Sequence, residues 1–288
     1  MTVYELLKNF EINYIRERLR PTTQSGYMVN INNHIIPHLA PIELSSLSAE
    51  DIDGLTAQLH CEGLSNKSIV YVHATLRKAI NYGIKRGFVK HNVYALVDLP
   101  RAEDYSYVTL DSKGAGKLLE AAKGKRIYPA VLLALNYGLC RGEVLGLRGS
   151  DYDSDTGAIH IRRTRNYVKN TVVETPCKTK NRRRLVLLAP EHTQLFLMLD
   201  PDEYLIKFSQ NRLNTDFAKL AASIGYPGFR FHDLRHTYAT LMMNNRVSPK
   251  IVSGVLGHSN VSVTLNIYSH PDIESQRVCL EVLKNSIG

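Results

Sequence analysis

The chain has 288 residues, 44% of them hydrophobic and 22% charged, which fits a globular protein of about two domains and argues against disorder. Its longest wholly apolar stretches, such as residues 130–135, are far shorter than the ~18 residues that a membrane span needs, and two glutamates lie where a secretory signal would be basic and then apolar. The excess of 36 Lys and Arg over 27 Asp and Glu, a formal net charge of +9, favours a polyanionic partner. We therefore expect a cytoplasmic protein without membrane contacts. Its four cysteines include no CxxC pair, which argues against a disulfide framework or a cysteine zinc cluster.

Residues 1–100 show the pattern of a helical bundle. Thr2 is placed to cap a helix that runs to about residue 17, and Pro21 suits the first turn of a second helix. Ser48, with an aspartate three residues later, forms a short variant of a capping box before a third helix, which Gly63 ends. Ser65 begins the last helix, whose polar face is basic. We expect this face to bind the polyanion through Lys67, Arg77 and Lys78.

The second half mixes helices with short strands. Residues 101–108 carry charges and no periodic apolar pattern, so we place a linker there. Asp111 then caps a helix, and a strongly apolar helix covers about residues 128–137. Strand patterns occur at residues 158–163, 171–174 and 184–188, which predicts a hairpin or small antiparallel sheet.

From residue 191 onward the pattern is helical again. Asn214 and Ser248 are capping candidates, and residues 227–228 form a Pro-Gly turn. A last helix is expected from about residue 272.

Positive charge is concentrated in residues 162–184, which hold nine basic residues and one acid, Glu174. Because basic and apolar residues alternate there, we expect an ordered platform rather than a solvated tail. The residues expected to bind the polyanion are Arg162, Arg163, Lys180, Arg182, Arg183 and Arg184.

Chemistry-bearing residues gather in four segments of the second half. These segments are NYGLCRGEVLGL (136–147), PCKTKNRRRLVLL (176–188), FHDLRHTYATLM (231–242) and LGHSNVSVTLNIYSH (256–270). His232 and Arg235 lie three residues apart on a predicted helix, so both can meet one phosphate. Tyr268 lies among polar neighbours. A phenol, two histidines, an arginine and a lysine are the groups that a metal-free attack on a phosphodiester requires.

In order and content these segments resemble the tyrosine recombinases, the phage-integrase family, and residues 1–100 resemble that family's core-DNA-binding domain. The resemblance implies a mainly α fold with a small antiparallel β-sheet, in which a helical bundle (1–100) and a linker (101–108) precede a mixed α+β catalytic domain (109–288). It also implies a site-specific recombinase that acts through a 3′-phosphotyrosine and a Holliday junction, without metal or cofactor.

The resemblance assigns a role to each site residue. Tyr268 is the nucleophile, Lys178 the general acid, Arg235 and His258 are phosphate ligands, and His232 is a proton carrier or ligand. The implied partners are duplex DNA with inverted core half-sites, three further copies in a homotetramer on two duplexes, and accessory DNA-bending factors, all at the nucleoid. The terminal helix is expected to pack on a neighbouring protomer.

One position departs from the family pattern. In the motif G-x-R-x-G-E/D, Cys140 occupies the slot of the first catalytic arginine. Arg141 is adjacent, but one helical step turns a side chain by ~100°, so we expect it to leave the pocket unless the register is shifted. A thiol cannot supply a guanidinium's charge or two-pronged donation. The chain is therefore expected to be an impaired recombinase.

Three alternatives remain open at the level of sequence. The first is a catalytically weak or inactive DNA-binding member of the same family, and the second is a type IB topoisomerase-like enzyme. In the third, His232 and His236 form a helical zinc site, which the intervening Arg235 disfavours because a cation repels the metal. The chain has no residues for the arm-site-binding domain of many integrases, so both a two-domain recombinase and a fragment of a longer one fit.

Overall fold

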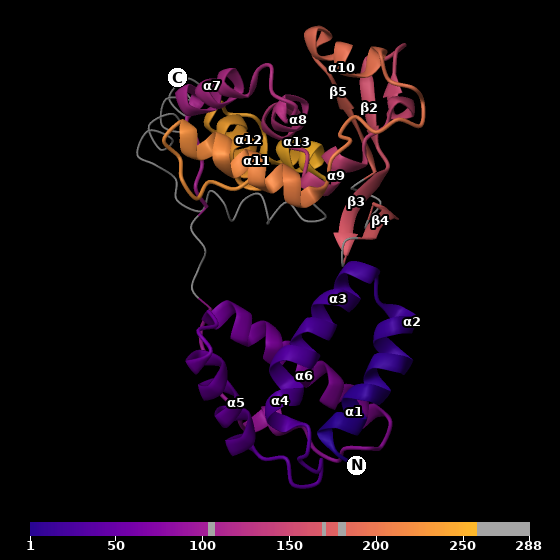
Figure 1. Cartoon of the computed structure of the whole chain (residues 1–288), viewed down its shortest axis with the longest axis vertical. Helices are drawn as coiled ribbons and strands as arrows, with labels where there is room; N and C mark the ends of the chain where they lie inside the picture. Colours follow the sequence, from indigo (N-terminus) through magenta and orange to yellow (C-terminus); the bar gives the residue numbers. More distant parts are fainter. Residues whose placement is uncertain (103–106, 169–170, 178–182, 258–288) are drawn as a thin grey trace, which may run out of the picture. The chain divides into compact units, whose positions relative to one another are not determined.

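The computed structural model describes residues 1–102, 107–168, 171–177 and 183–257 (Figure 1). Internal contacts divide the chain into two units, Met1–Ser106 and Tyr107–Gly288, each with its own hydrophobic core. The expected fold class, mainly α with small antiparallel sheets, is confirmed.

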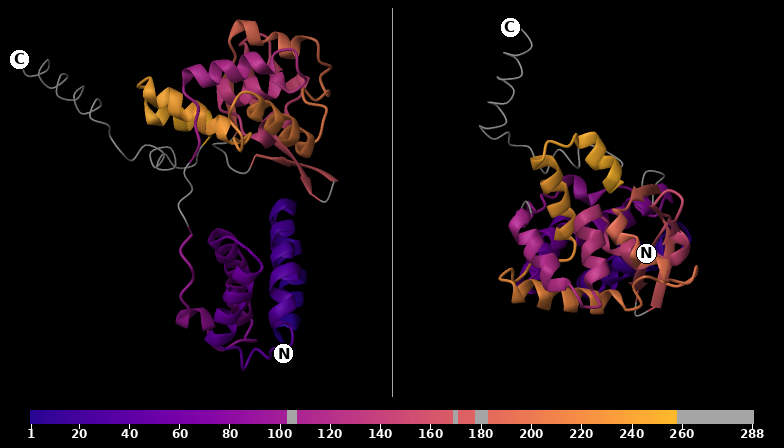
Figure 2. Two further views of the ribbon diagram at one scale, coloured as in Figure 1. Left: turned by 60° about the vertical axis from the view of Figure 1, so that its left-hand side comes forward. Right: turned by 90° about the horizontal axis from the view of Figure 1, so that it is seen from above.

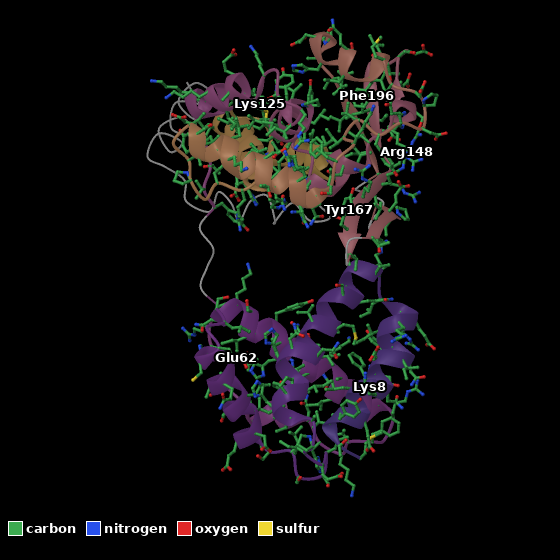
Figure 3. All side chains as sticks on the ribbon, viewed as in Figure 1. Lys8, Glu62, Lys125, Arg148, Tyr167 and Phe196 are labelled. Carbon is green, nitrogen blue, oxygen red and sulfur yellow. The ribbon has the colours of Figure 1, made fainter. Side chains whose placement is uncertain are left out.

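The first unit is a helical bundle. Its elements are α1 (Val3–Phe10), the π-helical turn η1 (Glu11–Ile15), α2 (Arg16–Arg18), α3 (Pro21–Val29), the π-helical turn η2 (Asn30–Ile35), α4 (Ile36–Leu39), α5 (Ala49–Cys61), α6 (Asn66–Lys85) and the 3₁₀ turn η3 (Val93–Leu96). The predicted caps at Thr2, Ser48 and Ser65 are confirmed, because each side chain accepts a hydrogen bond from the backbone three residues later. Side chains fill the interior between these helices (Figure 3).

The second unit contains the remaining elements. They are α7 (Ser112–Ala122), α8 (Tyr128–Tyr137), α9 (Arg141–Gly146), the 3₁₀ turn η4 (Gly149–Asp151), β1 (Tyr152–Asp153), β2 (Ala158–Ile161), β3 (Arg163–Val168), β4 (Thr171–Pro176), β5 (Arg184–Leu187), the 3₁₀ turn η6 (Pro190–His192), α10 (Gln194–Leu197), α11 (Gln210–Ser223), α12 (Asp233–Asn244) and α13 (Pro249–Leu256). Helix α8 matches its predicted span and has six consecutive buried residues. It packs against α7, α9 and α12, which makes it the centre of this unit.

Two small antiparallel sheets lie beside the helices of the second unit. One has the strand order β1-β2-β5, with Ile159 opposite Val186, and the other is the β3-β4 hairpin. The hairpin projects from the body of this unit (Figures 1 and 2).

Two local predictions need correction. Asn214 is not a cap: α11 begins earlier, where the Ser209 hydroxyl accepts from the backbone N–H of Arg212, so Asn214 lies within the helix. The strand expected at residues 158–163 ends at Ile161, and a separate strand, β3, follows from Arg163. The sequence did not reveal β3 because its first four residues, 163–166, are all polar and show no alternating apolar face.

Of the helices that the structure describes, none is long and apolar enough to cross a membrane. The terminal helix expected from residue 272 lies outside the described residues.

Candidate active site

The turn between α8 and α9 brings the first motif to the site. Gly138 ends α8 with φ of +66°, a conformation that disfavours side chains, and an added Cβ would lie 2.7 Å from Cδ1 of Tyr238. The backbone therefore passes directly against α12. This close passage leaves the Gly138 carbonyl facing α12 and places Cys140 at the N-terminus of α9.

Arg235, on α12, is held by backbone carbonyls from two other elements. Its Nη1 donates to Gly138 O at 2.9 Å and its Nη2 donates to Leu256 O, at the end of α13, at 2.6 Å. The side chain is only 7% exposed, and Nη1 lies 3.6 Å from Oε2 of Glu143. The carboxylate of Glu143 is thus the anion next to this buried cation, and the guanidinium plane is fixed by the two carbonyls.

Glu143, on α9, is the buried anion of this site. Its carboxylate is 1% exposed and accepts hydrogen bonds from Arg184 at 3.0 and 3.1 Å and from the Cys140 backbone at 2.9 Å. Burial by itself would raise the pKa of Glu143, but the hydrogen bonds and charges of Arg184 and Arg235 outweigh it and lower the pKa. Glu143 is therefore ionised and provides one negative charge between the cations of Arg184 and Arg235.

Arg184 does not have the position that was expected of a DNA-binding residue. Its side chain is 7% exposed, and besides Glu143 its Nε contacts the carbonyl of Val255 on α13. An arginine so enclosed cannot reach a DNA backbone. It ties β5 to α9 and α13 instead.

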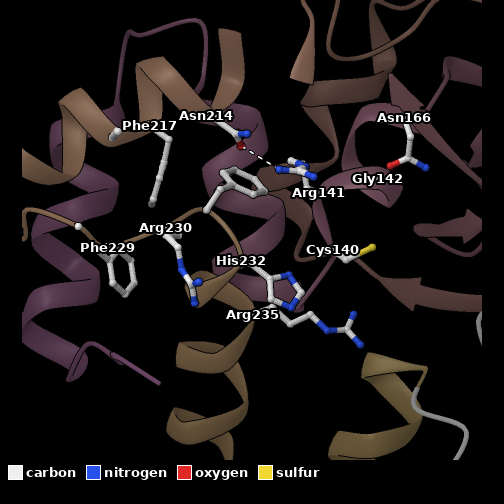
Figure 4. Close-up of a pocket in the computed structure, with 13 residues that line it drawn as sticks. Cys140, Arg141, Gly142, Asn166, Asn214, Phe217, Phe229, Arg230, His232 and Arg235 are labelled. Carbon is white, nitrogen blue, oxygen red and sulfur yellow. Dashed lines mark hydrogen bonds between the residues drawn. The ribbon is translucent and has the colours of Figure 1, made fainter. Parts of the chain in front are cut away.

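Residues from two of the segments singled out in the sequence, 136–147 and 231–242, line a common pocket of about 750 Å³ (Figure 4). His232, which precedes α12 and is exposed, lines it together with Arg235 and the half-buried Cys140. Desolvation lowers the pKa of His232, and the charge of Arg235 lowers it further, so the imidazole is uncharged at neutral pH. The geometry thus places the fixed cation of Arg235, the neutral imidazole of His232 and the thiol of Cys140 around a common space.

Arg141 lines the same pocket, contrary to the expectation that it would turn away. Figure 4 shows its guanidinium directed toward α11, where Nη1 donates to Oδ1 of Asn214 at 3.2 Å. Its buried Nε has no hydrogen-bond partner among the described residues, and burial lowers its pKa. Arg141 and Arg235 therefore approach the pocket from different elements.

The other predicted site residues lie outside the described residues. They are Lys178, Lys180, Arg182, His258 and Tyr268. The structure does describe Gly257, which ends α13 with φ of +70° directly before His258.

Within the basic segment, the structure separates inward-facing from outward-facing arginines. Arg162 is 49% exposed, and Arg183 is exposed. Arg163 is only 18% exposed because it is paired with the buried carboxylate of Asp151, so less of its guanidinium is offered at the surface than was expected. Arg165 is buried and donates to the carbonyls of residues 206 and 208.

The three cations predicted on α6 are exposed. Arg77 lies over the ring of Tyr94 with 6.0 Å between its Cζ and the ring centroid, and Lys78 lies over the ring of Tyr14 at 5.6 Å. These contacts orient the side chains while leaving their charges at the surface.

His236 does not form the zinc site considered above with other described residues, because no group of three suitable ligands occurs among them. Its ring instead stands edge-on to that of His232, with 5.1 Å between centroids. The ion pair of Glu143 with Arg184 was also not predicted. Glu143 is visible in the sequence as the acid that ends the G-x-R-x-G-E/D motif, but its partner lies 41 residues away.

Comparison with known proteins gives consistent matches along the chain. The sequence model described as "Phage integrase family" matches residues 109–275, and "Phage integrase, N-terminal SAM-like domain" matches residues 2–59. A tyrosine recombinase XerC-like protein of Caldanaerobacter subterraneus is 26% identical over 99% of this chain and 83% of its own. The transposase of transposon Tn916 from Enterococcus faecalis is 24% identical over 91% of this chain and 73% of its own.

Solved structures show the same fold. The Tn1549 transposon integrase in complex with transposon right end DNA has a TM-score of 0.82 at 22% identity, covering 99% of this chain and 100% of that one. A lambda integrase tetramer bound to a Holliday junction has a TM-score of 0.71 at 18% identity, covering 93% of this chain and 77% of that one.

Proposed function

The chain belongs to the phage integrase family, and from that premise we propose that it is a site-specific DNA recombinase acting through a covalent tyrosine intermediate. The observation that supports this most directly is the meeting of two motifs almost a hundred residues apart, where Arg235 donates to the carbonyl of Gly138 beside Cys140 and His232. A fixed guanidinium and an uncharged imidazole at an open pocket suit a reaction that builds negative charge on a phosphate and moves protons.

The proposed chemistry is a transesterification. The Tyr268 oxygen attacks the scissile phosphorus, a bond from tyrosine to the 3′-phosphate forms, and the bond to the 5′-oxygen of the next nucleotide breaks. Lys178 donates a proton to that leaving oxygen, and His232 takes up or relays the tyrosine proton. A 5′-hydroxyl from the partner duplex reverses the step, so the phosphodiester energy is kept in the phosphotyrosine.

Arg235 is the residue whose part in this chemistry the described geometry supports best. Two of its five N–H groups are held by carbonyls, and Glu143 prevents an accumulation of uncompensated charge behind it. Because its orientation is set before DNA arrives, little reorganisation is needed when the pentavalent phosphorane forms. His258, which follows Gly257 at the end of α13, is proposed as the second phosphate ligand.

Duplex DNA is the proposed partner of both units. On α6 the proposed contacts are Lys67, Arg77 and Lys78, and in the second unit they are Arg162, Lys180, Arg182 and Arg183. Most of them would bind phosphates and would therefore supply affinity rather than sequence specificity.

We also propose a tetramer on two duplexes as the active assembly, with the terminal helix of each protomer docked on a neighbour. Its support is the likeness to lambda integrase, which has been seen as a tetramer on a Holliday junction. Deletion of residues 272–288 is expected to abolish pairing of two DNA sites while single-site binding stays nearly intact. Unchanged pairing would exclude this role for the terminal helix.

A second candidate function follows from Cys140. The thiol lines the pocket in the slot where the family has its first catalytic arginine, so the chain would bind DNA but cleave it slowly or not at all. Loss of one preorganised donor costs about 10²–10³ in rate.

The test begins with selection of the half-site from a randomised duplex pool by the full chain. The selected site is then nicked next to the scissile phosphate, so that cleavage releases a short fragment and traps the covalent adduct. We expect a detergent-resistant protein–DNA adduct that Tyr268→Phe abolishes without weakening DNA binding. An exchange assay on two duplexes then separates a recombinase from a topoisomerase-like enzyme.

Each other outcome has a defined meaning. Binding without an adduct, in both this chain and its Cys140→Arg variant, would contradict the enzymatic proposal and leave the DNA-binding one. An adduct that persists in Tyr268→Phe would show that another residue is the nucleophile.

A further inference from the structure

Tyr107, the first residue of the second unit, lies against a histidine next to the catalytic pocket. Its ring centroid is 3.9 Å from that of His236, and the two planes differ by 35°. Tyr107 remains 47% exposed, so it covers the outer face of His236 rather than filling the core. At this separation the rings are in contact, and the tyrosine shields one face of the imidazole from water.

His236 in turn contacts His232. The ring centroids are 5.1 Å apart and the ring planes are nearly perpendicular, at 85°; His232 is the N-cap residue of α12 and His236 lies one turn into that helix. An edge-on neighbour at this distance limits the orientations open to the His232 ring. The rings of Tyr107, His236 and His232 thus form a continuous series that ends in the pocket with Arg235 and Cys140.

The backbone that carries Tyr107 is anchored to the same helix. The backbone N–H of Leu110 donates to Oγ1 of Thr237 at 3.2 Å, and that hydroxyl donates to the carbonyl of Asp233 at 2.9 Å. Leu110 and Thr237 are both buried. Residues 107–110 therefore run alongside α12. The hydrogen bond of Leu110 to Thr237 fixes the backbone three residues after Tyr107 and so supports the contact of Tyr107 with His236.

The charged groups around His236 determine whether its imidazole is protonated. His236 is surrounded by His232, Asp233, Arg230 and Arg235 on or beside its own helix, and by Tyr107 from the segment packed on it. Burial, followed by the neighbouring His232, Arg235 and Arg230, lowers its pKa to about 4 against the opposing charge of Asp233, so His236 is uncharged at neutral pH. A hydrated His236 would protonate more readily and would place a positive charge one turn from His232.

We infer that Tyr107 is a positioning residue for His232: by covering His236 it keeps that imidazole uncharged and holds the His232 ring toward the pocket. The contact can be tested in the chain without DNA, while its value for proton transfer rests on the function proposed above. Tyr107 is not among the residues that line the pocket, and its ring contact with His236 is the route by which it acts on His232.

The experiment compares Tyr107→Ala with Tyr107→Leu and Tyr107→Phe in the full chain. The ring-CH signals of the histidines are titrated by NMR, with His232→Gln and His236→Gln used to assign the two resonances. We expect Tyr107→Ala to raise the pKa of His236 by at least one unit, a tenfold shift in protonation, and to move the signal and pKa of His232. Tyr107→Phe should match the unaltered chain, and Tyr107→Leu should lie between, because it restores cover without an aromatic face.

Cleavage of the nicked half-site provides the second measurement. Its pH profile should shift in Tyr107→Ala together with the histidine pKa values, while Tyr107→Phe should keep the original profile. If Tyr107→Ala leaves the His232 titration unchanged, the inference is overturned, whatever the cleavage rate. If the titrations shift as expected but the unaltered chain never cleaves, the positioning contact stands and the recombinase proposal fails.

Discussion

Residue 140 decides whether the family's first arginine slot adds a guanidinium to the pocket beside Arg235. Arg235 is already oriented by the carbonyls of Gly138 and Leu256, but Cys140 adds no charge beside it. Arg141 carries a guanidinium at the same pocket, bound to Asn214 on α11 rather than to Gly138 or Glu143. The chain therefore has two ways to supply a second cation, and only one of them matches the register of the family motif.

We predict that Cys140→Arg increases formation of the covalent adduct about 10²- to 10³-fold, because a second preorganised donor would share the phosphorane charge. This corresponds to ~3–4 kcal/mol of barrier. Cys140→Ser is the matched control, since it keeps the size of the side chain and adds no charge, and it should leave the rate unchanged. The measurement is the gel-shifted adduct on the nicked half-site.

Arg141→Ala tests the competing register. In the unaltered chain it should change adduct formation little, because its guanidinium is engaged by Asn214. If Cys140→Arg gives no gain and Arg141→Ala abolishes the adduct, Arg141 is the catalytic arginine and the register across residues 138–143 must be revised.

Glu143→Gln should destabilise the second unit by about 3–5 kcal/mol, because it removes the counter-charge of two buried arginines. Since the folded-state pKa of Glu143 is lowered, its contribution is present above the unfolded value of about 4.5 and is lost as pH falls through the lower folded value. Urea titrations between pH 3 and 7 measure this. Glu120→Gln is the control: this exposed acid is paired only at the surface, and its loss should have little effect. If the stability of Glu143→Gln depends on pH in the same way as that of the unaltered chain, Glu143 is not the ionised counter-charge of these arginines.

At the scale of single elements, local capping bonds and buried polar contacts define where helices begin and how they pack. Helix α6 shows both: Ser65 caps its start, and His73 in its middle is fully buried. The His73 ring contacts Oγ1 of Thr56 on α5 at 3.0 Å and the Tyr94 hydroxyl of η3 at 2.9 Å. This one side chain therefore links three elements of the bundle.

The stability of the bundle should depend on the protonation of His73. Burial lowers the pKa of His73 to about 4, against 6.5 in the unfolded chain. Between these values the unfolded chain binds a proton that the folded one does not, so stability falls as pH decreases from about 6.5 to about 4, by ~3 kcal/mol in all. Hydrogen exchange of α6 amides follows this loss locally. His73→Gln should be less stable at pH 7 but lose this pH dependence, and retention of the full dependence would contradict the role of His73.

At the scale of the whole molecule, both units present exposed cations, but the charged segments differ in how many charges reach the surface. On α6 all three predicted cations are exposed, whereas Arg163 and Arg184 in the second unit are used internally. Net charge therefore overstates the number of DNA contacts that the basic segment can make.

If the chain neutralises about 6 to 10 phosphates, its DNA affinity should fall about 10³- to 10⁵-fold between 50 and 200 mM salt. Arg77→Ala and Arg162→Ala should each reduce the slope of log affinity against log salt by about 1. Lys123→Ala, which removes an exposed lysine paired with Glu120, is the matched control and should leave the slope unchanged. Fluorescence anisotropy with a labelled half-site measures all of these, and an affinity that is insensitive to salt would exclude phosphate binding as its main source.

Features set by residues close in the chain could be predicted from the sequence alone. The caps at Thr2, Ser48, Ser65 and Asp111 and the apolar span of α8 are confirmed, because capping bonds form within three residues and helical periodicity is local. The motif containing His232 and Arg235 was visible for the same reason. Asn214 shows the limit of such signals, since a residue that favours caps can also lie within a helix when a better cap precedes it.

Only the tertiary structure decided what each charged side chain does. Arg162 and Arg163 are neighbours in sequence and both approach buried Asp151, yet the side chain of Arg162 stays 49% exposed and that of Arg163 only 18%. Likewise Arg184 forms an ion pair with Glu143, 41 residues away, and the ring of Tyr107 contacts that of His236, more than a hundred residues away. The physical reason is that burial makes a charge costly unless a partner is present, and the partner comes from whichever distant element the fold packs alongside.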